Sequence, residues 1–450
     1  MRTKNKLLWV LLIAMLMALT LVTSCTSDTP DVYEPYTPVA EEPTPPPPTP
    51  EPPPPTPEPT PIPEPEISFT IISPYATVDW EAWNQYKAAF HVHTRNSDGS
   101  ASLPQMVERH YELGFNILAI TDHRGLTAHW TLVPEVMDNN ATNNDHPERG
   151  IPMCPDRMAD MAAGVGRDGA PGMIGLCNTT EQGGSGGGMS APFHINTFWV
   201  PETMCSTYRA RAVLDRVMYH NGVARLNHPG RYTHGRHEDW DVPSEASNNL
   251  SNIIFMTNLF LEYPIENFVG MEIINSRDNE SRSDRVLWDN ILMRTMPERP
   301  VWGFSDDDSH SLGAIGLAYN IMLMPELTQD AVRDSKVTGA FYAVSSFARR
   351  EGVNADIDVS PGNAVLIYLR NRPNPRISNI EVYNGSITIT GTLYEVIEWI
   401  ADGEIIYTGN TLIIRNHVDY INNYVRAQLR STAGIAFTQP FGIVWECEDN

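Results

Sequence analysis

The sequence Phe90-His91-Val92-His93-Thr94, with Ser97-Asp98-Gly99 and Ile120-Thr121-Asp122-His123 after it, decides how this chain is interpreted. Its pattern predicts a strand, a loop, a helix and a second strand. Side chains two positions apart on a strand leave the same face of the sheet, so His91 and His93 are expected side by side. Two imidazoles at a strand end favour half of a metal site. A partly buried, hydrogen-bonded histidine pair is the alternative.

The rest of the chain after Lys87 alternates between strand and helix patterns. Such alternation predicts an α/β fold class with a mostly parallel sheet, open or closed into a barrel. The expected elements are strands 88–93, 116–121, 223–227, 268–275, 301–305 and 317–324, and helices 104–113, 206–220, 282–293 and one from residue 328.

The N-terminus predicts export. Arg2, Lys4 and Lys6 precede an apolar run over 7–22, which is typical of a secretory signal. Leu21-Val22-Thr23-Ser24-Cys25 resembles the lipobox of bacterial lipoproteins. Residues 1–25 are therefore predicted to be a lipoprotein signal peptide whose Cys25 is lipidated, and an uncleaved membrane anchor is the alternative. Either way, an exported, membrane-anchored protein at the extracytoplasmic face is expected.

Residues 26–66 are rich in Pro, Thr and Glu, which predicts an extended, disordered linker. The formal net charge of −24 argues against binding to a nucleic-acid duplex, which needs a basic surface. A small anionic ligand stays compatible with this charge if metal ions supply positive charge locally. With Cys25 assigned to lipid, the pairing of the other cysteines is open: Cys154, Cys177, Cys205 and Cys447.

Two segments interrupt the α/β pattern. Residues 125–205 form a long insertion rich in Gly, Asn and Pro, and such insertions usually form lids or binding loops. After Pro373 and Pro375, short β segments and a hairpin signal at Asp402-Gly403 predict a small all-β, sandwich-like domain over 373–450. Residues 67–372 would then form the α/β domain. The β domain could bind carbohydrate or cover the α/β domain as a scaffold.

Further ligand-type side chains follow predicted strands in the α/β domain. They are Glu181, His194, His228, Asp308 and His310. In α/β barrels the loops beyond the C-terminal strand ends form the active-site rim, where such residues could bind two or three divalent ions together. Each residue also has an ordinary interpretation as part of a turn or a strand end. The remaining histidines, His129 among them, are expected to be ordinary surface or helix residues.

Four motifs, in this order, resemble those of the PHP (polymerase and histidinol phosphatase) domain. They are His91-Val-His93-Thr with Ser97-Asp98-Gly99, Ile120-Thr-Asp-His123, Asn227-His-Pro-Gly-Arg231-Tyr and Ser305-Asp-Asp-Asp-Ser-His310. The similarity spans residues 87–346. It implies a distorted (β/α)7 barrel with two or three divalent ions, usually manganese, zinc or iron.

The resemblance also implies a ligand set. His91, His93, Glu181 and Asp308 would hold the first ion; Glu181, His194 and His228 the second; and Asp98, His123 and His310 the third. Asp308 fits the Asp-x-His spacing, but Asp306 and Asp307 lie close enough in sequence to compete with it.

The expected function is a metal-dependent phosphoesterase that cleaves a small phosphate ester with a hydroxide bridging two metals. Asp308 and His228 are the expected catalytic residues, and Arg124 and Arg231 would contact phosphate, unless they are ordinary surface arginines. Asp122 could orient a ligand imidazole or only end its strand. Hydrolysis of an amide, carbamate or carboxyl ester is one alternative. A surface lipoprotein that binds metal or glycan without catalysis is another.

Overall fold

The structure is a computed structural model of the 450-residue chain. It describes residues 68–132, 146–184, 193–203, 209–231, 249–275, 281–346 and 372–446. The expected signal peptide and linker, Cys205 and Cys447 lie outside these ranges. Among the described helices, none combines the length and apolar character needed to span a membrane.

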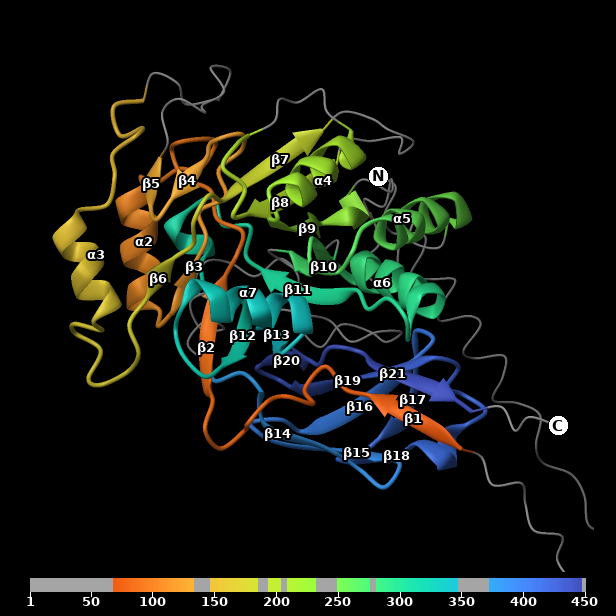
Figure 1. The fold of residues 1–450 in the computed structure, drawn as a ribbon. Helices are drawn as coiled ribbons and strands as arrows, with labels where there is room; N and C mark the ends of the chain where they lie inside the picture. Colours follow the sequence, from red (N-terminus) through yellow and green to blue (C-terminus); the bar gives the residue numbers. More distant parts are fainter. Residues whose placement is uncertain are drawn as a thin grey trace, which may run out of the picture. The chain divides into compact units, whose positions relative to one another are not determined.

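Two sheets carry the α/β part of the chain (Figure 1). The larger has the order β1-β21-β19-β20-β13-β12-β2-β3-β6, with β16 and β17 attached through β19. Its strands in this region are β2 (Asn84–Ala89), β3 (Ile117–Leu118), β6 (Ile174–Gly175), β12 (Ala318–Met324) and β13 (Phe341–Ser345). The smaller has the order β11-β10-β9-β8-β7. Its strands are β7 (Thr180–Gly184), β8 (Phe193–Phe198), β9 (Val223–Asn227), β10 (Phe268–Asn275) and β11 (Trp302–Asp306).

The mixed α/β class is confirmed, but the described strands do not close into the expected seven-stranded barrel. β2, β3 and β6 pair in parallel, as do β9, β10 and β11, whereas β7–β8, β8–β9, β2–β12 and β12–β13 are antiparallel. Between the two sheets, isolated backbone bridges pair Val92 with Ser309 and His123 with Glu181, while side-chain amides occupy the free edge of β11. Asn320 bonds to both the N–H and the C=O of Ser305, and Gln439 does the same at Gly303.

The helices begin and end at recognisable signals. Ser102 and Gln105 form a capping box at the start of α2 (Leu103–Glu112). The Thr328 side chain caps α7 (Gln329–Thr338), and Gly339 ends it at φ 78°. The remaining helices are α3 (Pro155–Ala162), α4 (Ala210–Tyr219), α5 (Leu250–Glu262) and α6 (Ser281–Thr295). The expected helices are therefore present, and α3 and α5 are additional. A short hairpin, β4 (Thr127–Ala128) and β5 (Thr131–Leu132), lies in the insertion.

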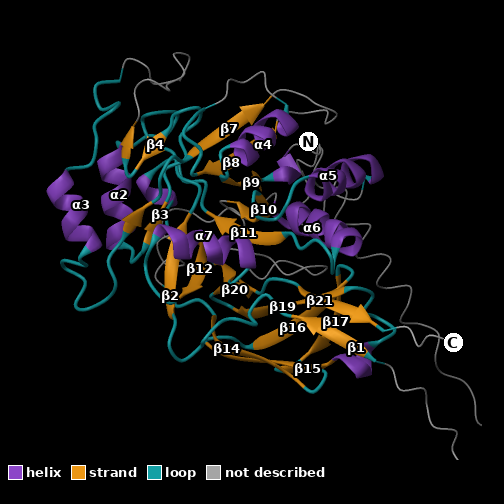
Figure 2. Cartoon of the chain, viewed as in Figure 1, coloured by secondary structure: helices purple, strands orange, loops and turns teal. Residues whose placement is uncertain are grey.

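The C-terminal segment is built of strands (Figure 2). β14 (Arg376–Tyr383), β15 (Ser386–Thr392) and β18 (Thr411–Ile413) form a three-stranded sheet. The other strands join the larger sheet: β16 (Val396–Ala401), β17 (Glu404–Thr408), β19 (Tyr424–Ser431), β20 (Gly434–Phe437) and β21 (Phe441–Trp445), with β1 (Phe69–Ile72) paired to β21. Because β20 pairs with β13, this segment continues the sheet that contains β2. An independent domain from residue 373 stays a prediction.

One lysine is buried in the apolar interior. Lys336 of α7 is fully buried, and its Nζ lies 3.4 Å from the ring centre of Phe90 and 4.0 Å from that of Phe198. This Nζ has no hydrogen-bond partner among the described residues. Burial holds the pKa of Lys336 well below its ordinary value. The side chain is therefore neutral in the folded protein at a pH where the unfolded chain binds a proton.

This difference in proton binding makes stability depend on pH. A folded-state pKa below the unfolded value means that stability rises as pH increases toward the ordinary lysine pKa of about 10.4. We expect Lys336→Met to raise the midpoint temperature of unfolding at pH 7, and the gain to shrink at pH 10, as measured by calorimetry. Lys87→Met is the control, since Lys87 Nζ donates to Leu113 O and its loss should give no gain. An unchanged or lower midpoint for Lys336→Met at pH 7 would contradict the expected cost of burying this amine.

Candidate metal centre

The structure brings the nine predicted metal ligands together. They form four overlapping groups, and within each group the ligand atoms lie within 4.8 Å of one another. They are His93 with Asp98, His123 and His310; His91 with His228 and Asp308; His91 with His93 and Glu181; and His123 with Glu181 and His194. The ligands follow β2, β3, β9 and β11 or lie on β7 and β8, so both sheets contribute to the cluster.

Glu181 is the centre of the cluster. Its carboxylate is almost fully buried and has imidazole nitrogens around both oxygens. Oε1 lies 3.2 Å from His91 Nε2, 2.9 Å from His194 Nδ1 and 3.4 Å from His228 Nε2. Oε2 lies 3.2 Å from His93 Nε2 and 3.2 Å from His123 Nδ1. A carboxylate in this position can bridge two neighbouring cations.

The geometry separates the three aspartates that compete in sequence. Asp308 Oδ1 lies 3.2 Å from His91 Nε2 and 3.1 Å from His93 Nε2. Asp306 instead forms an ion pair with Arg225. Asp307 accepts hydrogen bonds from three backbone N–H groups, those of Gly316, Leu317 and Ala318. Among these three, Asp308 alone directs its carboxylate into the cluster.

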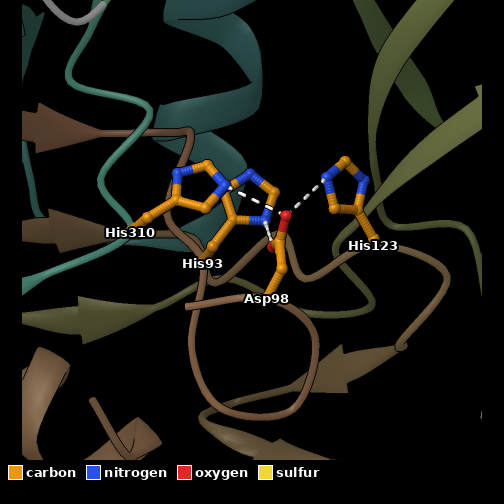
Figure 3. A group of neighbouring side chains, drawn as sticks. All are labelled: His93, Asp98, His123 and His310. Carbon is orange, nitrogen blue, oxygen red and sulfur yellow. Dashed lines mark ion pairs between the residues drawn. The ribbon is translucent and has the colours of Figure 1, made fainter. Parts of the chain in front are cut away.

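A second carboxylate group lies at the edge of the cluster (Figure 3). Asp98 reaches His93 Nδ1 at 3.4 Å, His123 Nε2 at 3.5 Å and His310 Nε2 at 3.4 Å. The side chain of Asp98 is 36% exposed, whereas that of Glu181 is 1% exposed. His93 faces Asp98 with one ring nitrogen and Glu181 with the other, so it joins the outer group to the buried one.

Electrostatics favour ionised carboxylates and cations here. Burial alone would raise the pKa of Glu181 and of Asp308, but the surrounding imidazoles hold both pKa values well below the ordinary range. Burial lowers the pKa of His93, yet its contacts with Asp308 and Glu181 outweigh this and raise the pKa to about 10. His91 and His93 each have a buried Nε2 without a hydrogen-bond partner in the described chain. Buried nitrogens directed at carboxylates fit a divalent ion that contacts both.

Strained backbone also occurs at the cluster. His228, Asp308 and Arg124 have φ values of 27°, 47° and 52°. Left-handed conformations of non-glycine residues cost on the order of 1–3 kcal/mol each and persist where the surrounding structure fixes them. Arg124 is fixed in part by its N–H, which donates to Glu181 O at 3.1 Å. The predicted phosphate ligand Arg124 therefore lies beside the cluster, while the side chain of Arg231, which ends the turn Pro229–Arg231, is outside the described part.

Glu272, which no motif of the sequence marks, binds the side chain of one cluster ligand and the backbone of another. Its Oε1 accepts from His91 Nδ1 at 2.7 Å and from Arg225 Nη2 at 2.8 Å. Its Oε2 accepts the His228 backbone N–H at 2.9 Å. Binding Nδ1 to a carboxylate directs Nε2 of His91 toward the centre. Each of the apolar strands 223–227 and 268–275 contains one charged residue, Arg225 and Glu272 respectively. A charge within an apolar strand is the signal that could have revealed both residues.

Asp122 acts on the loop and not on an imidazole. Its carboxylate accepts the Thr94 N–H, the Thr94 hydroxyl and the Ser97 hydroxyl, each at 2.7 Å. Ser97 Oγ also lies 3.2 Å from Asp98 Oδ1. Asp122 therefore fixes the loop that presents Asp98.

No family model and no curated protein matches this chain. Solved structures do. A two-domain protein from Bacteroides vulgatus, described as containing a predicted PHP-like metal-dependent phosphoesterase, is similar at 13% identity and a TM-score of 0.39, over 81% of this chain and 96% of that one. An amidohydrolase from Chromobacterium violaceum with bound sulfate is similar at 14% identity and a TM-score of 0.29, over 50% and 87%.

A protein from Bifidobacterium adolescentis, assigned as a metal-dependent phosphoesterase, is similar at 13% identity and a TM-score of 0.29, over 50% of this chain and 87% of that one. One of these structures is described as PHP-like, which is the family whose motifs the sequence resembles. Identity and TM-score are both low, so the chemistry of the centre rests on its own geometry.

The position of Glu272 leads to a test of metal affinity. We expect Glu272→Gln to weaken binding of manganese or zinc about 10- to 100-fold, because the tautomer and orientation of His91 are no longer fixed. Competition with a chelating dye measures this without an activity assay. Glu266→Gln is the control, since Glu266 is exposed and lies just before the same strand. Unchanged affinity in Glu272→Gln would contradict the role given to Glu272.

Proposed function

We propose that the protein is a metal-dependent hydrolase, and specifically a phosphoesterase that cleaves a small phosphate ester. The observation behind this proposal is the convergence of eight His and Asp side chains with the buried Glu181. Such a set suits hard and borderline divalent cations such as manganese, zinc or iron.

The proposed ligand sets follow the carboxylates. His91, His93, Glu181 and Asp308 would hold one ion, and Glu181 with His194 and His228 a second. Asp98, His123 and His310 would hold a third, with His93 next to it. Ions bound here would supply Lewis-acid polarisation of a phosphoryl oxygen and a lowered pKa of water.

The catalytic and phosphate-binding roles are assigned to individual side chains. Asp308 and His228 are assigned the catalytic positions because they face His91 from the loops after β11 and β9. Arg124 directly follows His123, and Arg231 lies three residues after His228; both are assigned to the phosphate. Such positive groups are needed because the chain carries a formal net charge of −24.

We also propose that the two sheets together form a distorted (β/α)7 barrel. In support, ligands from β2 and β3 in one sheet meet ligands from β7, β8, β9 and β11 in the other. The lipobox at Cys25 and the linker 26–66 support an exported enzyme that is held at the extracytoplasmic face of a membrane.

Substitution of buried ligands tests the proposal. We expect His91→Ala and Asp308→Asn to lose bound metal and to lower hydrolysis of aryl phosphates by about 100-fold or more, since both groups touch two or more other ligands. Metal content by mass spectrometry and a panel of aryl phosphomonoesters, phosphodiesters and carboxyl esters measure both effects. His417→Ala is the control, because His417 contacts the Tyr407 ring and is absent from the cluster.

Each result of that panel has a clear meaning. Wild-type activity in either ligand variant would contradict the site. Hydrolysis of carboxyl esters alone would replace the phosphoesterase proposal by an ester hydrolase. Less than one ion per chain, with no hydrolysis after manganese is added, would leave a binding protein.

A further inference from the structure

Outside the metal centre, a thiol lies against an imidazole. Cys177 Sγ is 2.6 Å from His129 Nε2. Cys177 is half-buried and His129 is exposed. The other free cysteine in the described ranges is Cys154, which is exposed. The pair is separate from the metal ligands, since neither residue belongs to the cluster.

The fold builds this pair with a strained turn. His129 and Trp130 are the two central residues of the β4–β5 hairpin, with φ values of 46° and 58°. Such turns usually contain Asn-Gly, because both central residues need positive φ. Here Trp130 fixes the turn: it is 2% exposed, and its indole N–H donates to Leu118 O at 3.3 Å. Gly175 gives the ring room, because a Cβ there would lie 2.6 Å from it.

A cavity of about 290 Å³ opens beside the imidazole. Its lining includes His129 and Trp130 and the apolar side chains of Met158, Met173 and Leu327. This volume is close to the lower limit of small-molecule pockets, and its walls favour an apolar or aromatic group.

The surroundings favour one reaction class. Acyl transfer would need hydrogen-bond donors for an oxyanion. The Gln329 amide next to Cys177 is already engaged, since its Nε2 donates to Gly175 O and its Oε1 accepts from Trp199. Exchange with a disulfide needs only a base for the thiol and an acid for the leaving sulfur. One imidazole can provide both.

We propose that Cys177 and His129 form a second reactive site, which exchanges with small aromatic or apolar disulfides. The Cys177 proton passes to His129 Nε2, and the thiolate attacks one sulfur of the disulfide. The new S–S bond to Cys177 forms as the original S–S bond breaks. The leaving thiolate takes the proton from His129. One thiol and one disulfide thus yield a mixed disulfide and a new thiol, with no further oxidant.

The imidazole is essential in this scheme. Partial burial raises the pKa of the Cys177 thiol, so without His129 it would react more slowly than an exposed cysteine. His129→Asn is an informative substitution, because asparagine tolerates positive φ and so preserves the turn.

The test uses the full chain and 2,2′-dithiodipyridine, with modified cysteines assigned by peptide mass spectrometry and Cys177→Ser as the blank. At pH 6.5 we expect Cys177 to react faster than Cys154. His129→Asn should lower the modification rate of Cys177 by at least about 10-fold and leave the modification rate of Cys154 unchanged. Unfolding temperature and metal content should match the wild type, which excludes a general loss of structure.

Three results would overturn the proposal. The first is a native chain in which Cys177 stays unmodified. The second is an equal rate in His129→Asn and wild type. The third concerns the cavity and compares the reaction rates of bis(2-hydroxyethyl) disulfide and 2,2′-dithiodipyridine. If the ratio of these two rates is the same at Cys177 as at free cysteine, the apolar cavity does not select the reagent.

Discussion

His91 lies between two buried carboxylates, and the arrangement of the centre depends on this contact. Its Nε2 is 3.2 Å from Glu181 Oε1, and its Nδ1 is 2.7 Å from Glu272 Oε1. His91 follows β2 of the larger sheet, whereas both carboxylates belong to the smaller sheet. Burying such charges costs several kcal/mol per ion unless each group is paired. Arg225 supplies part of the pairing, because it contacts Glu272 and Asp306 from inside the same sheet.

Between the two sheets the backbone pairs at isolated bridges, Val92 with Ser309 and His123 with Glu181, and side chains make further contacts. Around Phe90, the backbone N–H donates to Asp306 Oδ1 and the C=O accepts from Asn196 Nδ2. On the edge of β11, Asn320 and Gln439 take the place of a neighbouring strand. Buried polar networks of this kind are stable only when nearly every member is satisfied. Polar side-chain contacts therefore replace most of the strand pairing between the sheets. The same region is lined by groups that can bind ions.

The sequence marks the side chains that converge in the cluster because polar residues that follow a strand obey a local rule. The spacing Asp308-x-His310 marks one loop, whereas His91 and His93, expected on a strand over 88–93, lie after β2, which ends at Ala89. Glu272 and Arg225 could not be assigned in the same way, because their partners are distant in sequence. Likewise, the sequence does not distinguish the three consecutive aspartates Asp306, Asp307 and Asp308, because only their tertiary contacts differ. The helix α5 was missed because its pattern is apolar all round.

The charges of the centre link its folding to any cation that binds there. Asp98, Glu181 and Asp308 all have pKa values held below their ordinary range, so these carboxylates are ionised at neutral pH. With no metal bound, the raised pKa values of His91 and His93 mean that protons on these rings balance part of that charge. Metal ions need neutral imidazoles as ligands, so each ion bound must displace protons. The buried carboxylates thus require positive charge in either state, and the affinity for metal is set by competition with protons at His91 and His93.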